Sequence, residues 1–307
     1  MRVLAPFLLV ATLALGCTTI DLDARMSGRG GAGGTGATGG GGMTPWPYAP
    51  SWVPFVDGAY GFEGETLGHD DSEHGNDLAP RGAPTASSEA QQGTTALATD
   101  AGPPSNGLVS NPAALAASAT GVTYGGFMQV SVESVENPPY NMLMGKFGLA
   151  IKKGYLMEIF ADQNPLEQVS CAVGRTADWD NATSTSILGP SEWFHAVCRL
   201  HAASGVLHLL KNGVAERSIG SAVYHEPNSP FEINAESFGA GARFDDVFVV
   251  AAPLSDEAIR RIWACNLDGS RCLCNDTTPS LFDDCGRAEP TCDGLPACDT
   301  AEPPLMP

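Results

Sequence analysis

The chain has little positive charge. Its 307 residues include 16 Lys and Arg against 35 Asp and Glu, a formal net charge of −19. A nucleic-acid partner needs clustered Lys and Arg to neutralise its phosphates, and no such cluster occurs. The composition therefore argues against nucleic acid as a partner. An excess of negative charge more often serves only to keep a protein soluble in a salty medium outside the cell.

Signals of common enzymes are also missing. Neither a GxSxG nor an HExxH motif occurs in the sequence. Glycoside hydrolysis needs two carboxylates across a cleft, and Glu133 and Glu136 are the closest approach to such a pair. Their odd spacing places them on opposite faces of a regular strand. We therefore expect no catalytic activity, with a hydrolase built from noncontiguous carboxylates as the alternative.

The only long apolar run lies at the N-terminus. Arg2 precedes an apolar stretch from Val3 to Leu15, which is too short for a comfortable membrane span. It ends in LALGC, which resembles a bacterial lipobox, in which the Cys is lipidated after cleavage. We expect residues 1–16 to be a lipoprotein signal peptide and Cys17 a lipid anchor in the outer membrane or cell surface. An ordinary signal peptide is the alternative.

Cysteine parity agrees with that anchor. Nine Cys are present, and lipidation of Cys17 leaves eight, which allows up to four disulfides in an exported protein. Two of the eight, Cys171 and Cys198, fall in predicted strands and would pair if those strands are neighbours. The other six lie in a Cys-rich tail, residues 265–307, that disulfides rather than zinc would hold together. These six are Cys265, Cys272, Cys274, Cys285, Cys292 and Cys298. Their pairing stays open.

Between anchor and domain, residues 17–44 form a Gly-rich tether with no means of building a core. Its GxGxxG spacing lacks a flanking strand and helix, so it is no nucleotide fingerprint. The Pro- and aromatic-rich segment that follows, Met43–Val56, could stack sugars or lie extended along a sheet.

Beyond the tether the signals are alternating strands, and no long helical period precedes residue 255. Phe194–Leu200 and Val206–Lys211 form the clearest hairpin. Ser255 can cap a final helix whose Ile259, Ile262 and Trp263 make one apolar stripe. The strand candidates before the hairpin are 59–63, 126–135, 141–150, 155–161 and 168–173, whereas 66–100 has a loop-like composition. The sequence predicts an all-β, antiparallel two-sheet sandwich with a short C-terminal helix.

Three segments in this order resemble the laminin-G-like jelly rolls of the concanavalin A-like superfamily. They are FEG…DDSEHGND near Phe62, WFHAV with a hairpin ending at Asn212-Gly213, and FDDVFVVAAPLSDEAI. The resemblance implies a jelly-roll domain over residues 45–264. It further implies a lectin-like, surface-anchored binding module that recognises carbohydrate or cell-surface protein through loops at the sandwich edge. A structural envelope lipoprotein is the alternative.

Asp245 is the first candidate for a site. If Val247 and Val249 face the core, a period of two puts Asp245 on the same face and Asp246 in solvent. A carboxylate there must be paired or coordinate a cation. The resemblance implies a structural Ca²⁺ held by this acid and by oxygens of the opening loop. The expected loop ligands are Glu63, Asp71 and Asn76.

A second candidate is the segment Asp178, Trp179, Asp180 and Asn181, which we expect in a loop between Cys171 and Cys198. A ring beside carboxylates and an amide suits sugar binding, and the same residues also suit a polar turn. His195, His201 and His208 are expected to be isolated and half-exposed.

Overall fold

The computed structural model describes residues 56–63, 66–72, 74–91, 94–100, 106–130, 140–160, 168–175, 178–186, 188–189, 191–234 and 241–265. The expected signal peptide, Cys17, the tether, Glu133 and Glu136, and the tail beyond Cys265 lie outside these residues. Among the described helices, none is long and apolar enough to span a bilayer.

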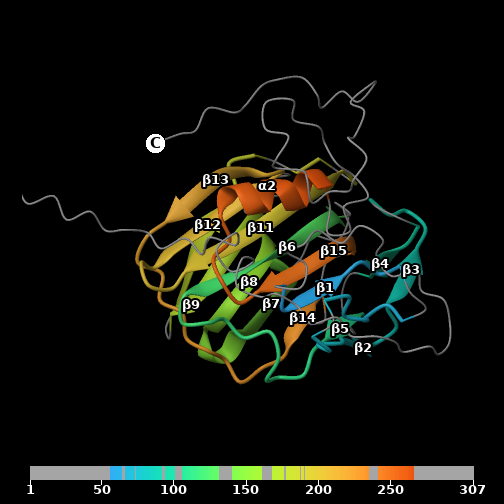
Figure 1. Cartoon of the computed structure of the whole chain (residues 1–307), viewed down its shortest axis with the longest axis horizontal. Helices are drawn as coiled ribbons and strands as arrows, with labels where there is room; N and C mark the ends of the chain where they lie inside the picture. Colours follow the sequence, from blue (N-terminus) through green and yellow to red (C-terminus); the bar gives the residue numbers. More distant parts are fainter. Residues whose placement is uncertain are drawn as a thin grey trace, which may run out of the picture.

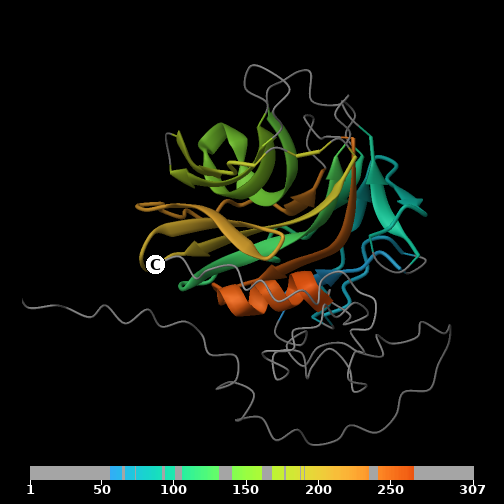
Figure 2. The ribbon, with the colours of Figure 1, turned by 90° about the horizontal axis from the view of Figure 1, so that it is seen from above.

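The described chain folds into two antiparallel sheets that pack face to face, which confirms the all-β sandwich (Figures 1 and 2). The order of the eight-stranded sheet is β13-β12-β11-β6-β15-β4-β3, with β1 paired to β15. Its strands are β1 (Gly58–Tyr60), β3 (Thr85–Ser87), β4 (Ala96–Thr99), β6 (Gly121–Val130), β11 (Trp193–His201), β12 (Val206–Lys211), β13 (Val214–Ile219) and β15 (Ala242–Val250).

The second sheet has seven strands in the order β10-β9-β8-β7-β14-β5-β2. They are β2 (Ala79–Arg81), β5 (Gly107–Val109), β7 (Tyr140–Gly148), β8 (Lys153–Phe160), β9 (Gln168–Arg175), β10 (Asp178–Thr183) and β14 (Phe231–Ile233). A 3-10 turn, η3 (Leu149–Ile151), follows β7.

Alternation along the long strands builds the core between the sheets. On β11, Phe194, Ala196, Cys198 and Leu200 join the main buried cluster, while the residues between them face outward. The β11–β12 hairpin pairs as the sequence predicts.

Helix α2 (Asp256–Cys265) covers the outer face of the eight-stranded sheet (Figure 2). Its Ile259 and Ile262 are fully buried against a second apolar cluster that includes Val197, Leu210 and Phe248. The predicted apolar stripe is therefore confirmed for these two positions.

The strands that the sequence did not reveal are short or polar. Residues 66–100 hold β2, β3 and β4, each of three or four residues, where we expected a loop. Strands this short carry too few residues to show alternation. They form by pairing with other strands: β4 pairs with β15, β3 with β4, and β2 with β5.

Candidate functional site

We predicted that Asp245 shares the core face with Val247, and this prediction is wrong. Phe244, Val247 and Val249 all belong to the main core, so the strand shifts by one residue between Asp245 and Phe248. Asp246 absorbs the extra residue with a left-handed φ of 46°. It is also only 4% exposed, so its predicted solvent position is wrong as well. Asp245 lies on the outer face, where it accepts N–H bonds from Gln91 (2.9 Å) and Asp246 (2.9 Å).

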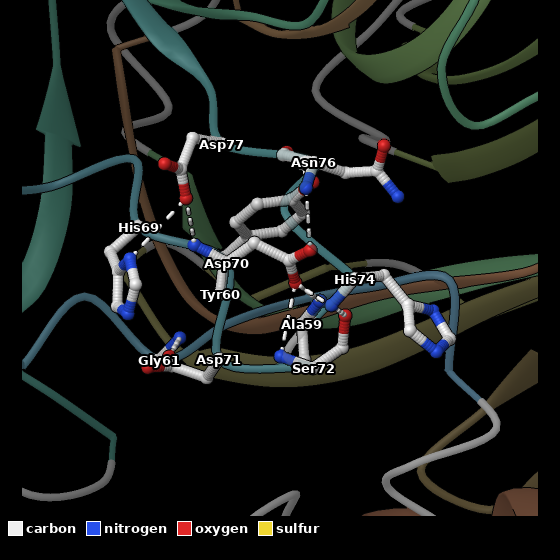
Figure 3. Close-up of polar contacts among 10 residues, drawn as sticks. All are labelled: Ala59, Tyr60, Gly61, His69, Asp70, Asp71, Ser72, His74, Asn76 and Asp77. Atoms are coloured by element: carbon white, nitrogen blue, oxygen red, sulfur yellow. Dashed lines mark hydrogen bonds and ion pairs between the residues drawn. The ribbon is translucent and has the colours of Figure 1, made fainter. Parts of the chain in front are cut away.

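The opening loop centres on Asp70, which the sequence analysis did not select (Figure 3). This carboxylate is 3% exposed. Oδ1 accepts the N–H groups of Ala59 (3.0 Å) and Ser72 (3.0 Å) and the Ser72 hydroxyl (2.6 Å), and Oδ2 accepts the Asn76 N–H (2.8 Å). The signal that could have found it is the pattern D-x-S, in which an aspartate commonly bonds the backbone two residues on.

The expected calcium ligands each bind a different part of the protein. Glu63 accepts N–H bonds from Thr94 and Thr95, Asp71 accepts one from Gly61 (3.1 Å), and Asn76 donates to the Asp57 carbonyl (2.6 Å). Burial raises the pKa of Asp71, and its bond from Gly61 opposes that rise.

These contacts do not fit a shared metal site. Within the described ranges, no three His, Cys, Asp or Glu side chains lie together in a way that could hold a metal ion. The described structure therefore does not group Asp245, Glu63 and Asp71 around one point, because the strand shift turns Asp245 away from where the alternation placed it. The role of these residues and of Asn76 as ligands stays a prediction. Calcium binding itself stays a prediction.

The segment predicted as a sugar-binding loop is instead β10, an edge strand of the seven-stranded sheet. Because successive side chains of a strand point to opposite faces of the sheet, the four residues do not share one face. Asp180 pairs with core-facing Val173, whereas Trp179 pairs with Gly174 and Asn181 with Ala172, on the outer face. Trp179 packs there against a small apolar cluster. The ring and the Asp180 carboxylate thus point to opposite faces of β10, whereas Trp179 and Asn181 share one face. Ligand binding by this segment stays a prediction.

The disulfide between Cys171 and Cys198 is present. We made this pairing conditional on neighbouring strands, but β9 and β11 belong to different sheets. The bond therefore joins the two layers through the core.

The histidines also differ from expectation. His195 is fully buried, and neither of its ring nitrogens has a hydrogen-bond partner among the described residues. Its ring centroid lies 4.8 Å from that of Phe127 and 6.4 Å from that of Phe248. Burial lowers its pKa to about 3. His201 and His208 are partly exposed, as expected, but they are not isolated, since their rings meet edge to face at 5.5 Å.

A buried acid on the outer face of the seven-stranded sheet had no sequence signal. Glu158 is 6% exposed and lies opposite Ser170 on β9 and Met142 on β7. Burial raises its pKa to about 7. An acid with such a shift often marks a functional site, and it also makes stability depend on pH.

The structure adds a pocket of about 480 Å³ at one end of the sandwich, which we call the end pocket. Three loop segments line it: 118–119 before β6, 202–205 between β11 and β12, and 221–224 after β13. Backbone hydrogen bonds tie these loops together, from Ala202 N to the Thr120 carbonyl (2.9 Å) and from Ala222 N to the Gly205 carbonyl (2.7 Å). These bonds tie the lining segments to one another.

Small side chains leave this hollow open. The lining consists of Ala, Gly and Ser residues together with Val223 and the half-buried Tyr224. Gly205 has a φ of +65°, and an added Cβ would lie 2.8 Å from the Ala222 carbonyl oxygen, so a side chain there would disturb the wall. Among the described residues, no charged side chain lines the pocket. It offers one aromatic ring, serine hydroxyls and backbone groups.

Comparisons with known proteins give the fold. No protein-family model and no curated protein sequence matches the chain. Among solved structures it is similar to the binding domain of Paraclostridial Mosquitocidal Protein 1, with a TM-score of 0.57 and 9% identity, covering 70% of this chain and 53% of that one. These similarities give the fold, an antiparallel two-sheet β-sandwich.

Two botulinum neurotoxin structures give the same result. One is described as showing that cell entry of type C depends on two ganglioside molecules (TM-score 0.53, 11% identity, 69% of this chain and 51% of that one). The other is the binding domain of neurotoxin DC in complex with rat synaptotagmin II (TM-score 0.53, 11% identity, 69% and 52%). The chain spans about half the length of the solved chains that it matches.

Proposed function

We propose that this protein is a non-catalytic, lectin-like binding module that recognises uncharged glycans through the end pocket. The observation that carries the proposal is the pocket itself, a hollow between hydrogen-bonded loops with one half-buried ring, several hydroxyls and no charged side chain among its described lining residues. Aromatic rings with a polar edge and fixed hydrogen-bonding groups suit sugars, which have both apolar ring faces and hydroxyls.

The solved neighbours support a binding role rather than a catalytic one. Their descriptions name receptor-binding domains, gangliosides and synaptotagmin. A cell-surface protein is therefore the second candidate ligand. Attachment to the outer membrane through Cys17 remains part of the proposal, since the anchor would display the sandwich outside the cell.

The decisive experiment is a glycan array probed with the full chain and with Tyr224→Ala. Loss of the ring should weaken binding about tenfold, the effect of one aromatic contact. Tyr224→Phe keeps the ring and should retain most of the binding. Trp179→Ala is the matched control, because it removes a half-buried ring from another surface.

Three outcomes would overturn the proposal. They are no glycan bound by the wild type, equal binding by Tyr224→Ala, or release of reducing ends from a bound polysaccharide. The last would point to a hydrolase instead. Melting temperatures of all variants show whether each one is folded.

A further inference from the structure

A row of side chains crosses the outer face of the eight-stranded sheet, away from the cluster under α2. The strand register places Trp193, Gln129, Arg243, Ala98 and Thr85 side by side on β11, β6, β15, β4 and β3. Their chain neighbours Phe194, Met128 and Phe244 face the core, so this row faces outward. We call it the Trp193 strip.

The polar members of the strip are held in fixed positions. Arg243 Nη1 donates to Gln129 Oε1 (2.6 Å), and Arg243 Nε donates to Ser87 Oγ (3.1 Å). Gln129 Nε2 in turn donates to the Ser191 carbonyl (2.9 Å). A ligand would therefore meet an ordered surface and would not bear the entropy cost of fixing these long side chains.

The strip is accessible and close to neutral. Trp193 and Gln129 are partly exposed, and the Arg243 side chain is 34% exposed. Glu89 lies 3.1 Å from Arg243 and offsets its charge. The chain as a whole carries a charge of −19, which repels polyanions. The charge balance therefore favours an uncharged ligand.

The shape of the strip differs from that of the end pocket. Four strand-to-strand gaps separate Trp193 from Thr85, which at about 4.8 Å each amounts to roughly 19 Å. A row of this length suits an extended chain, whereas the end pocket suits a compact group. An indole at one end, followed by amide, guanidinium and hydroxyl groups, matches the alternating apolar faces and hydroxyls of a polysaccharide.

We propose that the Trp193 strip is a second binding surface, which takes an extended, uncharged polysaccharide. The inference shares the ligand class of the proposed function but not its site. One module would then contact a long polymer along a sheet face and a sugar unit in the end pocket. Two linked contacts on one polymer raise the overall affinity well above either alone.

Affinity electrophoresis of the full chain in gels that contain uncharged or acidic polysaccharides tests this proposal. Wild type should be retarded by an uncharged polymer and not by an acidic one. Trp193→Ala should weaken the retardation about tenfold, and Gln129→Ala several-fold, because Arg243 then loses one of its holding partners. Trp193→Phe keeps a ring and should bind nearly as wild type. Trp179→Ala, the matched loss of a half-buried tryptophan from the other sheet, should behave as wild type.

The two proposals can fail separately. If Trp193→Ala migrates as wild type while Tyr224→Ala loses binding, the strip is overturned and the end pocket stands. If Trp193→Ala alone loses binding, the strip stands and the pocket does not. Absence of retardation of the wild type, or retardation by acidic polymers only, overturns the strip. Melting temperatures identify any variant that fails to fold, and Trp193→Phe then supplies the comparison.

Discussion

Cys171 and Cys198 join the two layers of the sandwich, one sulfur coming from each sheet. Both residues are fully buried within the main core. The bond therefore fixes the position of the two sheets relative to each other at a point where side-chain packing already holds them.

Replacing both cysteines by alanine should lower the free energy of unfolding by about 3 to 4 kcal/mol, because the bond closes a loop across a sequence separation of 27. Urea unfolding of the variant and of the wild type, with and without reductant, measures this loss. Reductant should affect only the wild type through this bond. Equal stability of the two proteins would contradict the role of the bond.

Asp70→Ala should lower the free energy of unfolding by about 3 kcal/mol, because it leaves the N–H groups of Ala59 and Ser72 without their acceptor. Asp71→Ala is the matched control, since Asp71 accepts the Gly61 N–H and is less buried. Its loss should be nearer 1 kcal/mol. If the two variants unfold at the same denaturant concentration, Asp70 does not hold the opening loop.

Glu158 should make the protein less stable as the pH rises. Burial raises its pKa from 4.5 to about 7, so the folded state holds a proton that the unfolded state has already released in that interval. Stability falls between those two values, and above pH 7 the ionised carboxylate costs about 3 kcal/mol.

Glu158→Gln removes this titration. The variant should therefore be more stable than the wild type at pH 8 and nearly equal to it at pH 4, as measured by urea unfolding at both values. A difference between the two proteins that does not change with pH would contradict the assignment.

His195 should make the protein less stable as the pH falls, the opposite of the effect of Glu158. Its neutral ring is buried and its pKa is lowered to about 3, so stability is lost as the pH falls from about 6.5 towards 3. His195→Leu removes two buried nitrogens that have no partner in the described part of the chain, and it should stabilise the protein by about 1 kcal/mol at pH 7 and by more at pH 5. His74→Leu, at an exposed position, serves as the control. A stability loss for His195→Leu that exceeds that of the control at both pH values would show that the imidazole has a polar role.

The sequence alone determined the parts of the fold that depend on local alternation. The long strands β6, β8, β9, β11 and β12 and the final helix follow from side-chain pattern. In each of them the apolar residues repeat with the period of the backbone, and that repeat is visible without any partner strand. Parity gave only an even number of cysteines, and the pairing of Cys171 with Cys198 across the two sheets needed the tertiary structure.

Only the tertiary structure decided where the sites lie. A single extra residue at Asp246 places Asp245 on the opposite face of the sheet from the one predicted. Pairing with β9 makes the segment that we expected as a loop into strand β10. The end pocket and the Trp193 strip each bring together segments that are far apart in the chain. Strand register and bulges arise from pairing between distant segments, so alternation within one segment cannot reveal them.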